Sequence, residues 1–356
     1  MALPPVQPAA LRPGRLLLWL LVLAALVVAA VRYRYGLGAV SNLSDRFPWG
    51  LWIGFDVMSG VALAAGGFTV AATVHVFKAH RFHILLRPAI LTGFLGYLLV
   101  AVALLVDLGR PWNIWHPILM WNPHSVMFEV GWCVILYLGV LTLEFGQIVL
   151  QRLRWNGLWR LTQRALPPLV VAGVILSTLH QSSLGSLFLI VPGKLHPLWY
   201  TPLLPVLFFI SAVAVGLAMV TVEATLAARA FGHELDLTLF ADLGRAAVVV
   251  LSVYLGAKAV DLVARGAWSW LLIPGVERVL FLTELALGVV LPLALLVVPA
   301  TARSRRGLAA ASWLIVAGVV LNRLNVAITG MLRGSGTTYV PAAGEVVITA
   351  GIVAGG

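Results

Sequence analysis

The sequence predicts an all-α integral membrane protein with about ten transmembrane helices. Of its 356 residues, 61% are hydrophobic and 10% are charged, whereas soluble domains carry about 25% charged residues. Apolar runs of about 20 residues, the length that crosses the hydrocarbon, recur along the whole chain. The Lys and Arg residues lie between these runs and do not form one patch. The net charge of +11 therefore reads as a topology signal and predicts no nucleic-acid partner.

Nine apolar runs are long enough to span a bilayer, and a tenth begins after them. The predicted spans are residues 15–34, 49–77, 84–108, 124–149, 165–190, 199–228, 238–264, 276–298 and 308–331. The tenth run starts near Glu345, and the sequence stops at Gly356 after about half a crossing. Either this helix is re-entrant or the chain continues, and we expect the second.

The first run has two interpretations. Arg12 and Arg15 precede it, as in a signal peptide, but the Arg-Tyr-Arg-Tyr that follows favours a membrane anchor. Lys and Arg are more frequent on the loops that share a side with the N-terminus. This predicts a multi-pass protein of a bacterial or archaeal cytoplasmic (inner) membrane, with a cytoplasmic N-terminus and with the connection from Asp107 to Trp121 facing the periplasm or its equivalent.

A weak internal repeat predicts how the spans are grouped. VDLGRPWNIW begins at Val106 and VDLVARGAWSW begins at Val260, so each half places an Asp, an Arg and a Trp at the outer face. Chance similarity between apolar segments is the competing explanation. The predicted units are 1–48, an N-terminal helix and outer loop; 49–190 and 191–331, two four-helix bundles; and 332–356, the start of a tenth helix.

Ionisable residues inside a bilayer cost about 2.5 to 3.5 kcal/mol each on insertion scales, so they are candidates for a functional site. At about 1.5 Å of rise per residue, four such polar residues share one layer near the outer face of the first bundle: Asp56, Glu129, His180 and Gln181. Four residues above this layer would form the mouth of a site: Asp107, Arg110, Trp112 and His124. The competing interpretations are interhelical hydrogen bonds, above all for Gln181, and a surface pair between Arg110 and Asp107.

Two further polar groups occur within the spans. Three candidates for a proton path lie toward the cytoplasm, where snorkelling to the interface is the alternative explanation: His75, Glu144 and Glu223. The second bundle carries a group that predicts a structural ion-pair network: Lys258, Asp261, Glu284, Asn322 and Arg323.

The numbers and positions of cysteine and histidine limit the cofactors that this chain could bind. The single cysteine, Cys133, provides no thiolate iron–sulfur cluster and no cysteine-based zinc site, so we expect neither a cluster nor a metal in this chain. A transmembrane b-type haem needs two histidines at one depth. Only His75 and His180 lie well inside spans, toward opposite faces, so the sequence predicts no haem.

Several segments together resemble the NrfD/PsrC superfamily of quinone-interacting membrane subunits. They are PWGLWIGFD at Pro48, DLGRPW at Asp107, WNPHSVMFEVGW at Trp121, LHQSSLGSL at Leu179 and NRLNV at Asn322. Within the superfamily the chain is most similar to the HybB type, the membrane subunit of a periplasmic nickel–iron hydrogenase. The resemblance covers the chain from about Phe47 to its end.

The resemblance implies two four-helix bundles with flanking helices and a quinone pocket near the outer face. The cofactor would be a quinone, menaquinone or ubiquinone. A periplasmic ferredoxin-like iron–sulfur subunit would dock over the pocket, together with the hydrogenase large and small subunits. Asp56, Glu129 and His180 would take the quinone-site roles. Competing functions are a secondary transporter, which also places charges near the midplane, and a passive membrane anchor of a periplasmic complex.

Overall fold

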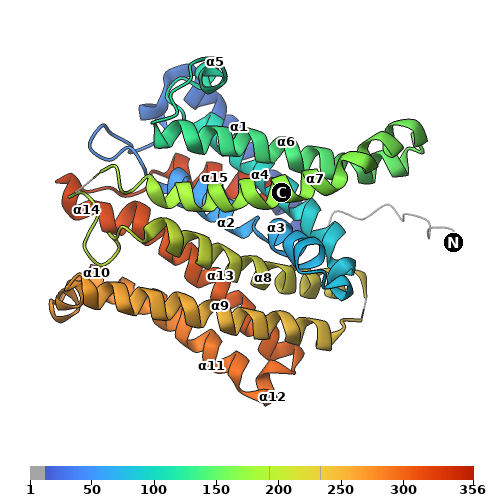
Figure 1. Cartoon of the computed structure of the whole chain (residues 1–356). Coiled ribbons are helices and arrows are strands. Elements are labelled where there is room, and N and C mark those ends of the chain that lie inside the picture. Colours follow the sequence, from blue (N-terminus) through green and yellow to red (C-terminus); the bar gives the residue numbers. More distant parts are fainter. Residues whose placement is uncertain (1–12, 192, 233) are drawn as a thin grey trace.

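The computed structural model describes residues 13–191, 193–232 and 234–356, and this part of the chain is built from helices without a β-strand (Figure 1). Among the described residues, nine helices are long and apolar enough to cross a membrane, and a shorter apolar helix follows them. This confirms the predicted fold class. Apolar runs in the sequence predict these helices, because a backbone in lipid must satisfy its hydrogen bonds internally and therefore forms a helix.

The first half of the chain contains these helices: α1 (Pro13–Tyr35), a second span made of a π-helix (Trp52–Ser59), α2 (Gly60–Leu63), α3 (Gly66–Ala71) and a π-helix (Ala72–Val76), then α4 (His83–Asp107), α5 (His116–Leu119), α6 (Val126–Arg152) and α7 (Asn156–Ser186). Short 3₁₀ helices occupy Leu37–Ala39, His80–Phe82 and Pro111–Asn113. The predicted span 165–190 is shifted, because α7 begins at Asn156 and continues past the hydrocarbon through a polar, arginine-rich segment.

The second half contains α8 (Leu204–Phe231), α9 (Leu237–Ala264), a 3₁₀ helix (Ala267–Leu272), α10 (Val276–Leu285), a π-helix (Ala286–Val290), α11 (Leu291–Val297), α12 (Pro299–Ala302), α13 (Arg305–Leu324), a π-helix (Asn325–Thr329), α14 (Gly330–Ser335) and α15 (Ala343–Gly355). Capping residues determine where several of these helices begin or end. Ser125, Asp236 and Ser304 cap α6, α9 and α13 by accepting hydrogen bonds from backbone N–H groups of the first turn. Gly232 ends α8 in the left-handed conformation, with φ +70°.

Three spans form the centre of the molecule. The second span, α8 and α13 are mostly buried, whereas the remaining spans expose one side. The second span packs against α4 and α8, α7 lies between α6 and α8, and α13 packs against α8 and the π-helix Trp52–Ser59. Helix α15 packs along α1.

Backbones approach closely where the second half is packed. A Cβ atom added to Gly288 would lie 2.6 Å from the Cα atom of Gly318. Glycine at both positions lets the π-helix Ala286–Val290 and α13 meet backbone to backbone, as small residues do between membrane helices.

The two ends of the helices differ in chemistry. One end, called here the aromatic end, carries α5 and the exposed side chains of Trp112 and Trp121. The other, called the basic end, carries the junction of α6 and α7 and the start of α13, with Arg152 and Arg305. In Figure 1 the aromatic end is on the left and the basic end is on the right.

Candidate functional site

Four charged side chains meet near the aromatic end, where α1, the second span, α4 and α15 converge. We call Arg32, Asp56, Asp107 and Glu345 the acidic cluster. Asp107 lies within electrostatic range of the other three. Arg32, at the end of α1, donates from Nε to the carbonyl oxygen of Val106 at 2.7 Å and so holds the end of α4. The cluster combines three carboxyl groups with one guanidinium.

Neighbouring donors hold two of these carboxyl groups. Thr349 Oγ1 donates to Asp56 Oδ2 at 2.6 Å. Tyr339 Oη donates to Glu345 Oε2 at 2.5 Å, and the backbone N–H of Asn42 donates to Glu345 Oε1 at 3.0 Å. Burial and the adjacent Glu345 carboxyl raise the pKa of Tyr339 above its ordinary value, so the phenol stays a neutral donor.

Asp107 is the least satisfied member of the cluster. Its Oδ1 atom is buried and has no hydrogen-bond partner among the described residues. A buried carboxyl oxygen without a donor is costly. The surface ion pair between Arg110 and Asp107, considered from the sequence, is not found among the described residues. Arg32 is the cation that lies within electrostatic range of Asp107.

Asp56 also borders a cavity of about 340 Å3. The second span, α4, α8 and α15 supply its walls, which are mainly apolar, with Phe55, Leu99 and Met219 among them. Thr92 lies in the wall toward the basic end and donates to Glu223 Oε2 at 2.9 Å. An apolar chamber of this size with a few polar groups at its ends is typical of a small-molecule site.

A second buried polar group lies between α4, α6 and α7. We call Tyr97, Tyr137, Ser177 and His180 the tyrosine–histidine cluster. The Tyr97 hydroxyl and His180 Nδ1 share a hydrogen bond of 2.9 Å, and the Tyr97 and Tyr137 rings meet edge to face with centroids 4.6 Å apart. Ser177 Oγ lies beside both tyrosine hydroxyls. Ser177 Oγ and His180 Nε2 have no hydrogen-bond partner among the described residues.

A third polar space opens at the basic end. His75 and Glu144, which the sequence proposes for a proton path, both line a cavity of about 210 Å3 together with Gln147. Glu144 also lies within electrostatic range of Tyr137, and both side chains border Gly173. Glu223, the third candidate, does not line this cavity and lies with Thr92 near the Asp56 cavity.

The structure separates several residues that the sequence groups in one layer. Glu129 is exposed in the first turn of α6 and lies outside the acidic cluster. Arg110, Trp112 and His124 are exposed in the connection between α4 and α6. Gln181 is buried and donates to the carbonyl oxygen of Val61 at 2.9 Å, which is the interhelical hydrogen bond that was its alternative interpretation.

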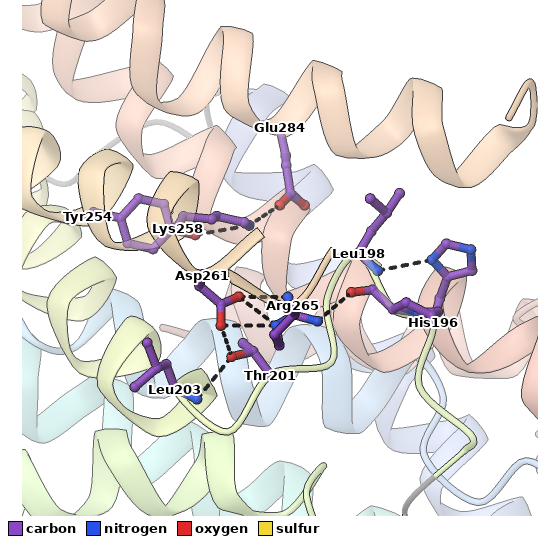
Figure 2. A network of polar contacts seen from close by, with 10 residues as sticks. His196, Leu198, Thr201, Leu203, Tyr254, Lys258, Asp261, Arg265 and Glu284 are labelled. Atoms are coloured by element: carbon purple, nitrogen blue, oxygen red, sulfur yellow. Dashed lines mark hydrogen bonds and ion pairs between the residues drawn. The ribbon is translucent and has the colours of Figure 1, made fainter. Parts of the chain in front are cut away.

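The predicted network of the second half is assembled around Glu284. Lys258 Nζ forms an ion pair with Glu284 Oε1 at 2.8 Å (Figure 2), and Asn322 Nδ2 donates to the same oxygen at 3.1 Å. Arg323 donates to Asn322 Oδ1 at 2.7 Å. Asp261 lies apart from this group and pairs with Arg265 at 2.6 Å.

Sequence reasoning missed Arg32, Glu345, Thr349, Tyr97 and Tyr137. Arg32 reads as an interface anchor, and Glu345 and Thr349 belong to the short tenth run. The tyrosines carry no charge at neutral pH, so a search for ionisable residues inside spans passes over them. Counting every buried hydroxyl within a span would have found them.

Comparisons with known proteins agree with the resemblance in the sequence. The family model described as "Polysulphide reductase, NrfD" matches residues 39–333. A protein of Escherichia coli (strain K12), named "Probable Ni/Fe-hydrogenase 2 b-type cytochrome subunit", is 32% identical over 340 residues, which is 94% of this chain and 86% of the relative. The "Menaquinone reductase, integral membrane subunit" of Nitratidesulfovibrio vulgaris (strain Hildenborough) is 30% identical over 250 residues, 67% of this chain and 58% of the relative.

The expectation of no haem is contradicted by the first of these relatives, because a b-type cytochrome subunit implies haem. One described histidine offers a ring nitrogen to a haem iron. His180 Nε2 is buried and unpartnered, and Tyr97 holds the other ring nitrogen. The remaining described histidines lie at span ends or in connections. His180 could supply one ligand atom, but it lines none of the cavities described above, and a second histidine at the same depth is not found among the described residues.

Proposed function

Because the chain belongs to the polysulphide reductase NrfD family, we propose that it is the quinone-reactive membrane subunit of a respiratory oxidoreductase complex. The observation that carries the proposal is Asp56, a buried carboxyl group at the wall of an apolar cavity of about 340 Å3 and in contact with a larger acidic cluster. The relatives named as hydrogenase and menaquinone reductase subunits support the same function.

Quinone reduction consumes two electrons and two protons, one proton for each carbonyl oxygen. The apolar walls of the cavity suit the ring and the first part of an isoprenoid tail. Asp56 would deliver a proton to the nearer oxygen, while Thr349 orients its carboxyl group by the 2.6 Å hydrogen bond. Asp107 and Glu345, which lie close to each other, would return a proton to Asp56 between turnovers.

Electrons would come from a periplasmic ferredoxin-like iron–sulfur subunit, in a complex with nickel–iron hydrogenase subunits. The aromatic end is the proposed docking side, because Arg110, Trp112 and His124 are exposed there above the acidic cluster. This end would face the periplasm of a bacterial or archaeal cytoplasmic membrane, with the N-terminus in the cytoplasm.

The tyrosine–histidine cluster suggests a route for protons from the opposite side. Glu144 borders the basic-end cavity and lies within electrostatic range of Tyr137. The Ser177 hydroxyl lies between Tyr137 and Tyr97, and Tyr97 shares a hydrogen bond with His180. In an apolar interior, carboxyl, hydroxyl and imidazole groups that lie this close can relay protons, and the unpartnered Ser177 hydroxyl would have to turn toward each tyrosine to do so. We propose this series of groups as the inner proton route, so that turnover conserves energy.

The test of the quinone site is Asp56→Asn in the intact complex. The amide preserves size and can still accept from Thr349, but it cannot deliver a proton. We expect quinone reduction to fall about 100-fold or more, with normal assembly of the complex. Asp45→Asn, at an exposed position in the loop before the second span, is the matched control. Normal turnover by Asp56→Asn would refute the role of this carboxyl group.

The test of the proton route is Tyr97→Phe, measured in proteoliposomes with a pH-sensitive dye in the compartment that the basic end faces. The substitution removes the hydroxyl that bonds His180 and leaves the ring packing. We expect fewer protons taken up per quinone reduced. Tyr35→Phe, at an exposed position at the end of α1, is the control. An unchanged ratio in Tyr97→Phe would exclude this route.

A further inference from the structure

A groove with excess positive charge lies at the basic end, between the start of α4 and the junction of α6 and α7. We call it the arginine groove, and it is lined by His83, Arg87, Gln147, Gln151, Arg152 and Gln163. Two adjoining cavities of about 210 and 560 Å3 form it, and Arg87 and Gln151 line both. Arg87 donates to Gln151 Oε1 at 3.1 Å, which fixes one guanidinium at the centre of the groove.

The positive charge of the groove is not neutralised by the protein. The ion pairs found among the described residues involve other cations, and neither Arg87 nor Arg152 has a carboxylate within 4.0 Å. Glu144 is the carboxyl group among the described lining residues, and its buried position places it at the deep end of the smaller cavity. His75 and His83 also face this space. The groove thus presents two guanidinium groups and several amides to an incoming ligand.

Helix lengths place the groove at the level of lipid headgroups. Helices α6 and α7 contain 27 and 31 residues, so they are about 40 and 46 Å long at 1.5 Å per residue, beyond a hydrocarbon thickness of about 30 Å. Their junction extends past the neighbouring helices at the basic end (Figure 1). Arg87 lies about 30 Å along α4 from Asp107 at the aromatic end. This distance equals the hydrocarbon thickness and places Arg87 at its boundary.

The rim of the groove is apolar and exposed. Val149 and Leu153, which line the larger cavity at the end of α6, are 39% and 54% exposed. Trp155, between α6 and α7, is 59% exposed, as expected for an interfacial aromatic. A ligand in the groove would therefore meet cations at its head and an apolar surface alongside, which is the pattern of a phospholipid.

We propose that the arginine groove is a specific site for an anionic phospholipid, with a phosphodiester bound between Arg87 and Arg152 and the acyl chains along Ile148 and Val149, which line the groove on the hydrocarbon side of Arg152. Guanidinium groups bind phosphate oxygens bidentately, and basic pockets between membrane helices bind anionic headgroups. A zwitterionic headgroup would add a cation to a site that already has a surplus of them. The inference does not depend on the proposed quinone chemistry.

The experiment uses the purified full chain after delipidation in mild detergent. Its thermal unfolding midpoint is measured against added cardiolipin, phosphatidylglycerol, phosphatidylcholine and inorganic phosphate. We expect saturable stabilisation by the two anionic lipids and little by the other two. The double variant Arg87→Gln, Arg152→Gln should bind these lipids roughly 25-fold more weakly, at about fivefold for each arginine. The double variant Arg305→Gln, Arg306→Gln, with exposed arginines at the start of α13, is the control.

Equal stabilisation by phosphatidylcholine would show a general detergent effect and would overturn the proposal. Equal stabilisation by inorganic phosphate would show an anion site without lipid specificity, and would also overturn it. The same loss in the control variant would assign the effect to net charge alone. Native mass spectrometry of the wild type and both variants gives an independent readout, because phospholipid should be retained by the wild type and the control and lost from the groove variant.

Discussion

Glu284 accepts hydrogen bonds from four different residues, more than any other carboxyl group in the described structure, and its removal should be more costly than removal of its ion-pair partner. Lys258 Nζ and Asn322 Nδ2 donate to Oε1 at 2.8 and 3.1 Å, and Asn325 Nδ2 and Trp199 Nε1 donate to Oε2 at 2.7 and 3.1 Å. Glu284→Leu would leave all four donors without this acceptor. Breaking a buried pair costs about 3 to 5 kcal/mol, and each orphaned neutral donor adds about 1 kcal/mol.

Lys258→Met is the contrasting change. It leaves Glu284 with three neutral donors, whereas Glu284→Leu leaves the ammonium of Lys258 with Tyr254 Oη at 3.4 Å and the face of Phe281. We expect a loss of about 1 to 3 kcal/mol for Lys258→Met and at least about 4 kcal/mol for Glu284→Leu. The assay is the free energy of unfolding in mixed micelles, with the double variant closing a cycle. A larger loss for Lys258→Met than for Glu284→Leu would refute this account of the network.

Two further predictions concern packing and pH. Gly318→Ala would place a Cβ atom 2.1 Å from the Cα atom of Gly288, so unfolding should become easier by about 1 to 3 kcal/mol; Gly256→Ala, with nothing within 4 Å, should show no such loss in the same thermal assay. Burial lowers the pKa of His196, which lies in the connection before α8. Its contribution to stability is therefore complete above its unfolded pKa of about 6.5 and is lost as the pH falls below that value. His196→Asn should reduce the acid-side fall in unfolding midpoint, and an unchanged pH profile would contradict the prediction.

The spans could be predicted closely because hydropathy reports a strong physical constraint. The prediction of 238–264 compares with Leu237–Ala264, and that of 84–108 compares with His83–Asp107. A backbone that crosses lipid in one segment must form a helix, so an apolar run of sufficient length is enough to predict a transmembrane helix. The method fails where a helix leaves the hydrocarbon, as α7 does from Asn156 through an arginine-rich segment, because there no hydropathy signal marks the end.

The candidate site could be predicted only in part. The sequence indicates how deep in the membrane a residue lies, but it does not indicate which way that face of the helix points. Asp56 and Glu129 lie at similar depths, but the first faces a cavity and the second is exposed. A regular period of 3.6 residues would assign faces, yet Asp56 lies within a π-helix, Trp52–Ser59, where that period does not apply. Contacts between distant segments, such as Thr349 with Asp56, have no local signature at all.

The acidic cluster combines residues from inside and from outside the region that matches the family. The matched family region, residues 39–333, contains Asp56 and Asp107. Arg32 and Glu345 lie outside it, on α1 and α15, which pack against each other. The flanking helices therefore contribute the guanidinium and the third carboxyl group, and Thr349 of α15 orients Asp56. Electrostatic interactions are strong in a medium of low dielectric, so these two helices set the charge environment of a carboxyl group that belongs to the core. Without these two helices Asp56 would lie in a different field, and its affinity for protons would differ accordingly.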